Sequence, residues 1–534
     1  MKKSLLFMLF ALVQMTFAEQ LVDGRYVNFE DFVTSVADVN GGNPKSLGMY
    51  KSNYVNGSNS TRHYVTNAMM QAAFTRAREL DAIGVYLPRG VWNFNDQIVV
   101  PHGMTLKGTY DRPHKVTEWD LYVKNGLVNW NKTRGTNIAC YSGWNNPPYT
   151  RRQSGGTRDV SACIALQGNA TLDGVNVYYP QQNTPSPNSS FSPVKYPWTI
   201  SCQAADGNDF EGRCAVMNTT LVNSYAGIDL NFAHDHYIRG VNMTAFKVGI
   251  RVDNVASLGS IEDVNMHPQY AAAYYRIPLS GETYDRMLSY LLDNMTGLDF
   301  GWADWGWLKG VFIFKAHRGF YFRRGEQGYA SDHPRAAASL AIENSGCDNC
   351  TDALYVEEVN SGIGVNFTNA VLIGRIYVGD DNHGPIRITN SYLAFDAGGY
   401  DKQPSGNVNY YYRNHVEVGK ATMMHISNTE IMDFMGDQPK GSWRGSTFDV
   451  KGKLLLSNSS IVWPGNGSGF GASAQMFMSR ARATVAFENL LIRGMSSVKK
   501  DGVGLVLEGI TIYDPIEFGY HPTVPSFDQY TGIQ

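Results

Sequence analysis

Charged residues are scarce in this sequence: only 17% of its 534 residues are Asp, Glu, Lys or Arg, and the formal net charge is −3. Helical solenoids are rich in Leu, Glu and Lys, so this composition argues against them. A net charge of −3 makes nucleic acid a poor candidate partner, and we expect no nucleic-acid binding. The 54 glycines favour a β-rich chain with many turns instead.

Long apolar runs are also absent beyond the first residues, so we predict no membrane span. Lys2 and Lys3 precede a short apolar run at 5–17, and Thr16 and Ala18 are small residues at the positions that a signal peptidase reads. The pattern predicts a signal peptide at 1–18, an N-terminal extension at 19–60, and a secreted or periplasmic protein.

Cysteine is rare as well, with six residues in the chain. Export would permit disulfides, and Cys202 with Cys214 is the best candidate for a local bridge. Cys347 and Cys350 have the spacing of a redox or zinc motif, but no second Cys or His pair stands near them, which favours a turn or a disulfide. We therefore predict no metal site and no cofactor, and leave a calcium requirement open because no dense carboxylate loop demands one.

Residues 66–80 form the clearest helix, with Thr66 or Asn67 as its N-cap. Its apolar residues fall on one face, at Met69, Met70, Ala73, Phe74 and Ala77. Short strands punctuated by Pro and Gly follow at 85–87 and 98–106.

The chain repeats itself with a period near 22 residues. GIDL at 227–230 recurs as GIRV at 249–252, and GLDF at 297–300 recurs as GFYF at 319–322. Alternating apolar residues at this period indicate one solenoid coil per repeat, with parallel strands stacked between coils and Asn side chains pairing at a recurring turn. We predict an all-β fold, a right-handed parallel β-helix over 61–515 with a tail at 516–534. The helix at 66–80 would cap its open end.

Three segments of the chain resemble the pectate lyase superfamily of β-helix proteins. VYLPRGVW at 85–92, followed by residues 98–108, resembles the opening of that group. Residues 249–268 and 300–320, with GIRVD, GSIEDV and FGWADW, are similar to secreted proteins related to family 28 glycoside hydrolases. The resemblance covers residues 60–330 and implies carbohydrate processing, by β-elimination as in polysaccharide lyases or by hydrolysis, without fixing which.

One departure from the family pattern concerns the polygalacturonases within it. They carry Asn-Thr-Asp, a paired Asp, His-Gly and Arg-Ile-Lys on successive coils. Here similar residues lie within one short segment, GDDNHGPIRI at 379–388, and no Asn-Thr-Asp precedes it. An intact polygalacturonase site is therefore not predicted.

Candidate acid–base residues cluster between residues 225 and 340. Elimination on a uronic-acid polymer needs a base, a cation that neutralises the sugar carboxylate, and an acid for the leaving oxygen. His236 and His267 fall on adjacent repeats, with Tyr270 and with Arg251 or Arg239 nearby, and we predict that these five residues form the catalytic group.

Candidate substrate-binding residues follow in the chain. Trp305 offers a flat apolar face to a sugar ring beside Asp304, and Lys315, Arg318 and Arg323 form a basic cluster suited to an anionic chain. The predicted partner is thus an anionic polysaccharide or oligosaccharide, and the predicted activity is that of a lyase.

Two alternatives stay open. A hydrolase would need two carboxyl groups facing one bond, and several are available nearby. These are Asp229, Asp235, Asp253, Glu262, Asp299 and Asp304. A non-catalytic glycan-binding β-helix is the other alternative.

The predicted signal peptide gives a direct test. We expect the mature chain to begin at Glu19, because Ala18 completes the small-residue cleavage pattern. Mass spectrometry of the exported protein measures this, and an intact Met1 on that protein would refute the assignment.

Overall fold

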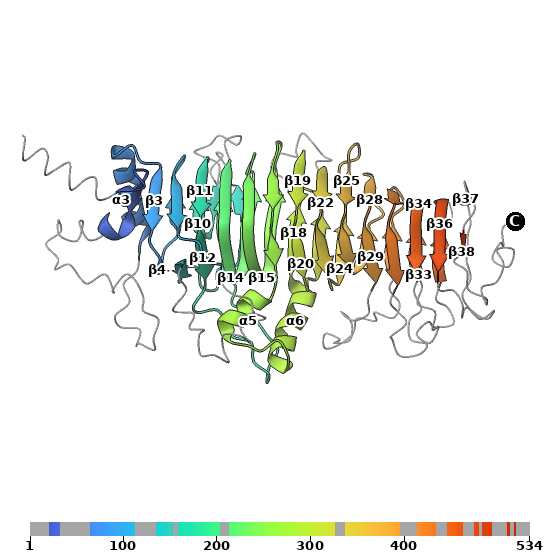
Figure 1. Ribbon diagram of the computed structural model, residues 1–534, viewed down its shortest axis with the longest axis horizontal. Helices are drawn as coiled ribbons and strands as arrows, with labels where there is room; N and C mark the ends of the chain where they lie inside the picture. Colours follow the sequence, from blue (N-terminus) through green and yellow to red (C-terminus); the bar gives the residue numbers. More distant parts are fainter. Residues whose placement is uncertain are drawn as a thin grey trace, which may run out of the picture. The chain divides into compact units, whose positions relative to one another are not determined.

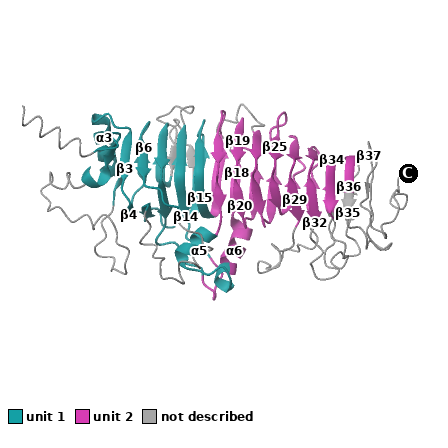
Figure 2. Cartoon of the chain, in the orientation of Figure 1, with its two compact units in different colours: residues 1–185, 192–245, 269–284 teal, residues 186–191, 246–268, 285–534 magenta. Residues whose placement is uncertain are grey.

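The computed structural model describes most of the chain, with gaps. The described residues are 21–32, 65–112, 135–148, 150–152, 158–202, 213–325, 337–395, 414–433, 446–462, 475–479, 483–493, 510–512 and 517–518. The predicted signal peptide, most of the extension at 19–60 and most of the tail at 516–534 lie outside them. The chain divides into two compact units, coloured separately in Figure 2. The first comprises residues 1–185, 192–245 and 269–284, and the second comprises residues 186–191, 246–268 and 285–534.

The predicted helix is present as α3 (Asn67–Glu79) in the first unit. The Thr66 hydroxyl is the N-cap and accepts a hydrogen bond from the Met69 backbone N–H, which satisfies one of the free donors of the first turn. Met70, Ala73, Phe74 and Ala77 are buried. This face contacts β2, β3 and β5, so α3 covers strands at the beginning of the unit, as the apolar pattern predicted.

The first unit consists mainly of parallel strands stacked in three rows, with β1 paired antiparallel to β2 at its beginning. Within each row, every strand pairs with the next one. The first row runs β5, β10, β13, β14; the second runs β2, β3, β6, β11, β14; and the third runs β4, β7, β12, β14. An antiparallel pair, β8 and β9, stands apart from these rows. The strands are β1 (Leu21–Val22), β2 (Tyr26–Asn28), β3 (Gly84–Leu87), β4 (Gly90–Phe94), β5 (Ile98–Val100), β6 (Thr105–Gly108), β7 (Thr136–Cys140), β8 (Thr150–Arg152), β9 (Arg158–Val160), β10 (Ala162–Leu166), β11 (Ala170–Asp173), β12 (Val175–Tyr178), β13 (Trp198–Cys202), β14 (Cys214–Asn231) and the first part of β15 (Tyr237–Asp253).

The second unit repeats the same plan. Sheet A contains the end of β15 with β18, β21, β24, β27, β30, β33 and β35; sheet B runs from β16 through β19, β22, β25, β28, β31, β34 and β36 to β37; sheet C runs from β17 through β20, β23, β26, β29 and β32, then through the ends of β34 and β36, to β38. The strands are β16 (Ser260–Glu262), β17 (Asn265–Met266), β18 (Thr296–Phe300), β19 (Gly306–Lys309), β20 (Phe312–Phe314), β21 (Arg318–Phe322), β22 (Leu340–Glu343), β23 (Gly346–Asp348), β24 (Asp352–Val356), β25 (Val365–Thr368), β26 (Val371–Ile373), β27 (Arg375–Val378), β28 (Ile386–Thr389), β29 (Tyr392–Phe395), β30 (Val416–Val418), β31 (Met423–Ser427), β32 (Glu430–Asp433), β33 (Ser446–Val450), β34 (Lys453–Val462), β35 (Gln475–Ser479), β36 (Thr484–Arg493), β37 (Ile510–Ile512) and β38 (Glu517–Phe518).

From β18 to β32, each coil supplies one strand to each sheet before the next coil begins, as in β18–β20, which are labelled in Figure 1, and then in β21–β23. The register pairs Leu298 with Phe320 and Phe320 with Leu354, and all three side chains are fully buried. Alternate residues therefore fill a continuous apolar interior, while their neighbours in each strand face outward. The prediction of an all-β, right-handed parallel β-helix is confirmed. A single domain over 61–515 stays a prediction.

Asparagines recur at the turn between sheets B and C. Asn344, Asn369, Asn458 and Asn489 all have φ between 48° and 54°, a left-handed conformation that Asn tolerates better than most residues. The side-chain amide of Asn369 donates to Asn344 Oδ1 at 3.3 Å, and that of Asn489 donates to Asn458 Oδ1 at 3.0 Å. The predicted pairing of Asn side chains between coils is thus confirmed.

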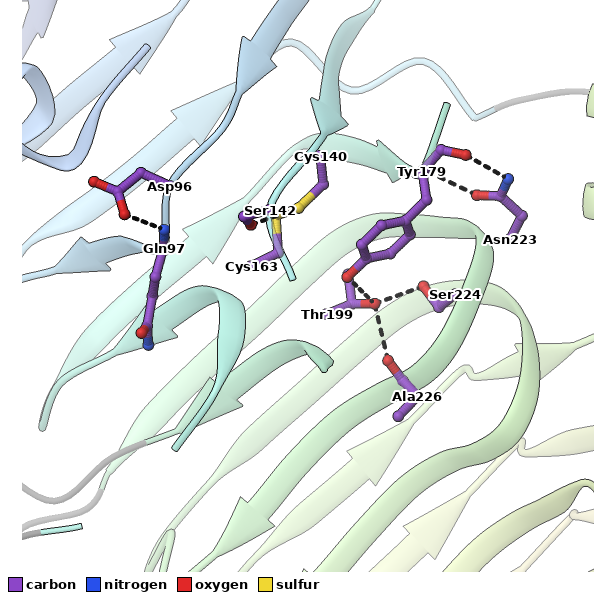
Figure 3. The surroundings of a disulfide bond; sticks show 10 residues. All are labelled: Asp96, Gln97, Cys140, Ser142, Cys163, Tyr179, Thr199, Asn223, Ser224 and Ala226. Carbon is purple, nitrogen blue, oxygen red and sulfur yellow. Dashed lines mark hydrogen bonds between the residues drawn. A yellow bond between two sulfur atoms is a disulfide. The ribbon is translucent and has the colours of Figure 1, made fainter. Parts of the chain in front are cut away.

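Three disulfides link the described cysteines. Cys202 bonds Cys214, as predicted, and Cys347 bonds Cys350, so the closely spaced pair is a disulfide. The third joins Cys140 to Cys163. Figure 3 shows this bond beside a buried polar group in which Tyr179 donates to the Thr199 hydroxyl and Thr199 donates to the Ala226 carbonyl. These buried hydroxyls are satisfied by protein partners, so the group ties β13 to β14 (Figure 3).

Two helices were not predicted from the sequence. They are α5 (Gln269–Tyr275) in the first unit and α6 (Glu282–Asn294), most of which lies in the second. Both fall between β17 and β18, where the 22-residue spacing is interrupted. Within the described residues, no helix has the length and apolarity that crossing a membrane would require.

The capping role of α3 predicts a local stability effect. Replacing Phe74, which is fully buried, by Ala should cost about 3–5 kcal/mol of unfolding free energy through lost burial and a residual cavity. Chemical denaturation of F74A beside R78A, a change at an exposed position of the same helix, measures this. Equal midpoints for the two variants would contradict the proposed packing.

Candidate functional site

The outer face of sheet A carries a column of polar and aromatic side chains in the second unit. The register aligns Arg251 with Asp299, Asp299 with Tyr321, Tyr321 with Tyr355, and Tyr355 with Tyr377. All five positions correspond to the outward residue of their strand, because the residues on either side point into the coil. We call this column, from Arg251 to Tyr377, the sheet A face.

A buried charge cluster anchors the beginning of the sheet A face. Arg323 Nη1 donates to Asp253 Oδ2 at 2.9 Å, and its Nε donates to Asp299 Oδ1 at 2.8 Å. The Asp253 side chain is fully buried, and its Oδ1 also accepts the backbone N–H groups of Asn254 and Trp302. Asp253 thus binds several protein donors and serves to hold Arg323, while Asp299 keeps a 13% exposed side chain.

Burial raises the pKa of the Asp299 carboxyl above its ordinary value, and the cations of Arg323 and Arg251 only partly oppose this. A carboxylate with a raised pKa is a stronger base than an exposed one, and it retains a proton to higher pH. Asp299 is thus the carboxyl group of this cluster that is suited to proton transfer.

Gly301 is required by the same cluster. A Cβ at this position would lie 2.3 Å from Asp253 Cγ and Oδ1, closer than any real Cβ contact. A glycine here lets the backbone pass directly over the Asp253 carboxylate, so that the Trp302 N–H can donate to it.

Arg318 is held by aromatic rings and not by a carboxylate. Its Cζ lies 4.4 Å from the ring centroid of Tyr321 and 3.9 Å from that of Tyr355, within the range of cation–π contacts. Among the described residues it makes no ion pair, and its Nε is buried without a hydrogen-bond partner. Arg375, by contrast, pairs with Asp352 at 2.6 Å and with Glu417 at 3.4 Å. The sheet A face therefore carries one guanidinium that no described carboxylate compensates.

Tyr321 stands between Arg318 and Asp299. Its hydroxyl donates to Glu357 Oε1 at 2.7 Å. Burial, followed by the hydrogen bond to Glu357, raises the pKa of the Tyr321 phenol, so the phenol is protonated at neutral pH. A half-buried phenol in this state can donate a proton but is a poor base.

The predicted catalytic residues of the first unit are buried or hydrogen-bonded to other groups of the protein. The His236 ring is buried, and its Nδ1 lies 2.8 Å from the Ala233 carbonyl oxygen; because a carbonyl only accepts, Nδ1 carries the proton. Tyr270 lies on α5, fully buried, and donates to Asn242 Oδ1 at 2.6 Å. Arg239 donates to the Tyr237 hydroxyl. These three side chains thus bind separate partners, and their catalytic role stays a prediction.

The predicted residues of the second unit separate into two groups. Arg251, Arg318 and Arg323 gather at the sheet A face. His267 follows β17, and its ring stacks on that of Phe314 at 4.7 Å between centroids. Lys315 also lies there, with Nζ 5.5 Å from the Phe314 centroid. His267 and Lys315 therefore belong to sheet C and its following turn.

Asp304 and Trp305 occupy the turn before β19. Asp304 Oδ2 accepts the Trp302 indole N–H at 3.0 Å, and Oδ1 accepts the Ser339 hydroxyl at 3.4 Å. Trp305 is 63% exposed and has φ 55°, an uncommon conformation for so bulky a residue. Asp304 thus fixes the turn, and Trp305 projects from it.

Tyr321, Tyr355 and Glu357 lie in this region but were not predicted as site residues from the sequence. A signal was present: the third letter of GIRV, GLDF and GFYF is Arg251, Asp299 and Tyr321, and equal repeat positions become neighbours in a solenoid. Within the described residues, no group of three or more His, Cys, Asp or Glu side chains could hold a metal ion.

Comparison with known proteins leaves the family open. No protein-family model matches the chain, and no curated protein does. Solved structures that it resembles include the catalytic domain of a GH87 α-1,3-glucanase in complex with tetrasaccharides (12% identity, 87% of this chain and 69% of that one, TM-score 0.39). Another is the DFA-IIIase from Arthrobacter chlorophenolicus A6 in complex with GF2 (8% identity, 83% of this chain and 95% of that one, TM-score 0.40). A third is the tailspike protein of E. coli bacteriophage HK620 in complex with a pentasaccharide (9% identity, 88% of this chain and 78% of that one, TM-score 0.42). These similarities are distant, so the fold assignment depends on the strand pairing of this chain. The resemblance to the pectate lyase superfamily stays a prediction.

The buried imidazole of His236 predicts a pH effect on stability. Burial lowers its pKa from 6.5 to about 4. Between these values the unfolded chain binds a proton that the folded protein does not, so stability falls as the pH falls from 6.5 toward 4. Between pH 7 and pH 4.5 this site should contribute a loss of roughly 2–3 kcal/mol.

The test compares wild type with H236N, which retains an N–H donor for the Ala233 carbonyl. Chemical denaturation at pH 7 and pH 4.5 should show a smaller acid-induced loss in H236N than in wild type. The exposed His102 provides the control, H102N, which should behave as wild type. An identical acid-induced loss in wild type and H236N would show that His236 is not the buried neutral group described.

Proposed function

We propose that this protein is a polysaccharide lyase that cleaves an anionic, uronic-acid-containing polysaccharide by β-elimination at the sheet A face. The observation that carries the proposal is the guanidinium of Arg318, which lies over the rings of Tyr321 and Tyr355 and pairs with no carboxylate among the described residues. A partly buried cation beside flat aromatic surfaces suits a sugar ring that bears a carboxylate.

The three tasks of elimination can be assigned to adjacent strands. Arg318 neutralises the sugar carboxylate, which acidifies the neighbouring C–H bond. Asp299 accepts the proton from that carbon, a double bond forms to the adjacent carbon, and the bond from that carbon to the glycosidic oxygen breaks. Tyr321 protonates the leaving oxygen, since its raised pKa keeps the phenol protonated. Solvent then restores both groups to their starting protonation states.

This assignment moves the acid–base pair from His236 and His267 to Asp299 and Tyr321. The sheet A face supports it because Asp299 and Tyr321 are register neighbours on β18 and β21, and each keeps a partly exposed side chain. The His236 ring is buried with its Nδ1 bonded to the Ala233 carbonyl, and the His267 ring stacks on Phe314 beside sheet C.

Hydrolysis is the second candidate, favoured by one observation. The raised pKa of Asp299 would also suit a general acid that protonates a glycosidic oxygen. Hydrolysis would then require a second carboxyl group. Glu357 is a candidate, because it is exposed and accepts a hydrogen bond from the hydroxyl of Tyr321, the register neighbour of Asp299.

We also propose that the protein acts outside the cytoplasm, in a secreted or periplasmic form. Three disulfides among the described residues support this, because such bonds persist in oxidising compartments. The proposed chemistry uses no metal, so the assay is to be run with and without a chelator.

The test measures product chemistry on anionic polysaccharides, following absorbance of the unsaturated product together with reducing ends. We expect new absorbance, and a loss of about 100-fold or more in kcat/KM for R318Q because a positioned charge is removed. Y321F should lose about 100-fold in kcat with little change in KM.

The control is R213Q, which removes an arginine whose side chain is 64% exposed in the first unit. It should retain wild-type activity, and thermal melts should show that every variant is folded. Reducing ends without absorbance, with activity lost on Asp299→Asn and Glu357→Gln, would favour the hydrolase. Full activity in R318Q would remove the basis of the proposal.

A further inference from the structure

A second outward column of side chains lies on sheet B, on strands that do not belong to the sheet A face. The register aligns Ser260 with Trp307, Trp307 with Ala341, Ala341 with Asn366, and Asn366 with Arg387. These positions come from β16, β19, β22, β25 and β28 (the last four are labelled in Figure 1). The column continues to His425 on β31.

Trp307 is an exposed indole between two short side chains of this column. Ser260 on one side and Ala341 on the other have side chains too short to cover an indole, and Trp307 is 45% exposed. Trp305, in the turn two residues before it, is exposed as well. A large aromatic ring left open on a sheet face, beside small residues, offers a flat apolar surface to a ligand.

Arg387 supplies a charge at the other end of the column. Its Nη1 donates to the Ile363 carbonyl at 2.9 Å and to Asn366 Oδ1 at 3.2 Å, and both acceptors are neutral. Among the described residues, no carboxylate pairs with it. The neighbouring His425 ring, whose Nε2 lies 2.9 Å from the Ser457 hydroxyl oxygen, carries no negative charge and so does not compensate Arg387 either. Arg387 therefore contributes a guanidinium charge that pairs with no carboxylate among the described residues.

We propose that Trp307, Asn366 and Arg387 form a docking strip for an anionic polysaccharide, separate from the sheet A face. Trp307 stacks on a sugar ring, Asn366 and Arg387 bind polar and anionic groups farther along the chain, and Ala341 leaves room between them. Three strand steps of about 4.8 Å separate Trp307 from Arg387, a span of roughly 14 Å that requires an extended ligand of several units.

The chemistry of the strip favours a glycan over a protein partner. Its single indole is flanked by short, amide and guanidinium side chains, whereas the core of a protein-binding patch is contiguous and apolar. Glu262 and Glu343 share the outward face of β16 and β22, two residues from Ser260 and Ala341, but neither pairs with Arg387. An anionic group of the chain is therefore bound at the Arg387 end of the strip. The inference shares with the proposed function only the class of polymer, and it does not depend on cleavage.

Affinity gel electrophoresis through polygalacturonate or alginate tests the strip, with dextran as the neutral polymer. The measurements use the Y321F background, so that cleavage does not complicate retardation. We expect W307A and R387Q each to weaken binding to an anionic polymer by about tenfold, the scale of a loss at a well-placed contact, and added salt to weaken binding of the parent.

Two matched controls accompany these variants. W144A removes a tryptophan that is 48% exposed in the first unit, and R213Q removes an exposed arginine there; both should bind as the parent does. In an otherwise wild-type chain, W307A and R387Q should cleave short oligosaccharides at the wild-type rate, whereas R318Q should not. Activity thus reports on the sheet A face and retardation reports on the strip.

Several results would overturn the proposal. These are unchanged retardation of W307A and R387Q, equal loss in W144A and R213Q, absence of parent binding to both anionic polymers, or stronger retardation by dextran than by either of them. Retardation by polyglutamate as strong as that by the polysaccharides would indicate an acidic protein segment as the partner. If W307A and R387Q reduce retardation as expected while neither wild type nor any variant cleaves a polymer, the docking strip is supported and the proposed lyase activity is refuted.

Discussion

The in-register stacking of parallel strands determines which side chains become neighbours on the surface of each unit. Backbone hydrogen bonds between successive coils bring residues at the same repeat position next to one another, so that a column of side chains acts as one surface. A shift of one residue would exchange the inner and outer faces and would place Leu298 and Phe320 in solvent. The sheet A face and the docking strip are both products of this register.

Charge compensation distinguishes the two kinds of arginine on sheet A. Arg375 is partnered by two carboxylates and Arg323 by two more, so these cations satisfy buried acids and hold strands together. Arg318 occupies an equivalent outward position but rests on tyrosine rings. A cation that costs desolvation and meets no carboxylate among the described residues contributes little to folding, which is why we assign it to a ligand.

Much of the fold could be read from the sequence because its signals are local and periodic. The apolar pattern and the Thr66 cap identified α3, and the repeats GIDL, GIRV, GLDF and GFYF identified coils, since both depend on residues close in the chain. Helices α5 and α6 were missed because they interrupt the period. Asn242, a residue far from α5 in the chain, is the partner of the Tyr270 hydroxyl, and such a contact leaves no local pattern.

The candidate site was only partly predictable for the same reason. The positive cluster at Arg318 and Arg323 was predicted because its basic residues are close in the sequence. That Arg323 is neutralised and Arg318 is not depends on Asp253 and Asp299, which reach Arg323 from other coils. His236 and His267 looked catalytic as residue types. Burial of one ring and stacking of the other against Phe314 are properties of the packed chain, and no spacing in the sequence indicates them.

The Arg323 cluster also has a consequence for synthesis of the chain on the ribosome. Asp253 is made 70 residues before the guanidinium that neutralises it, and Asp299 is made 24 residues before it. A nascent chain that has emerged only as far as β18 therefore holds two carboxylates that cannot both be buried at low cost. The coils that contain them should remain open until β21 and Arg323 have been added, so these coils would close together and not one by one in the order of translation.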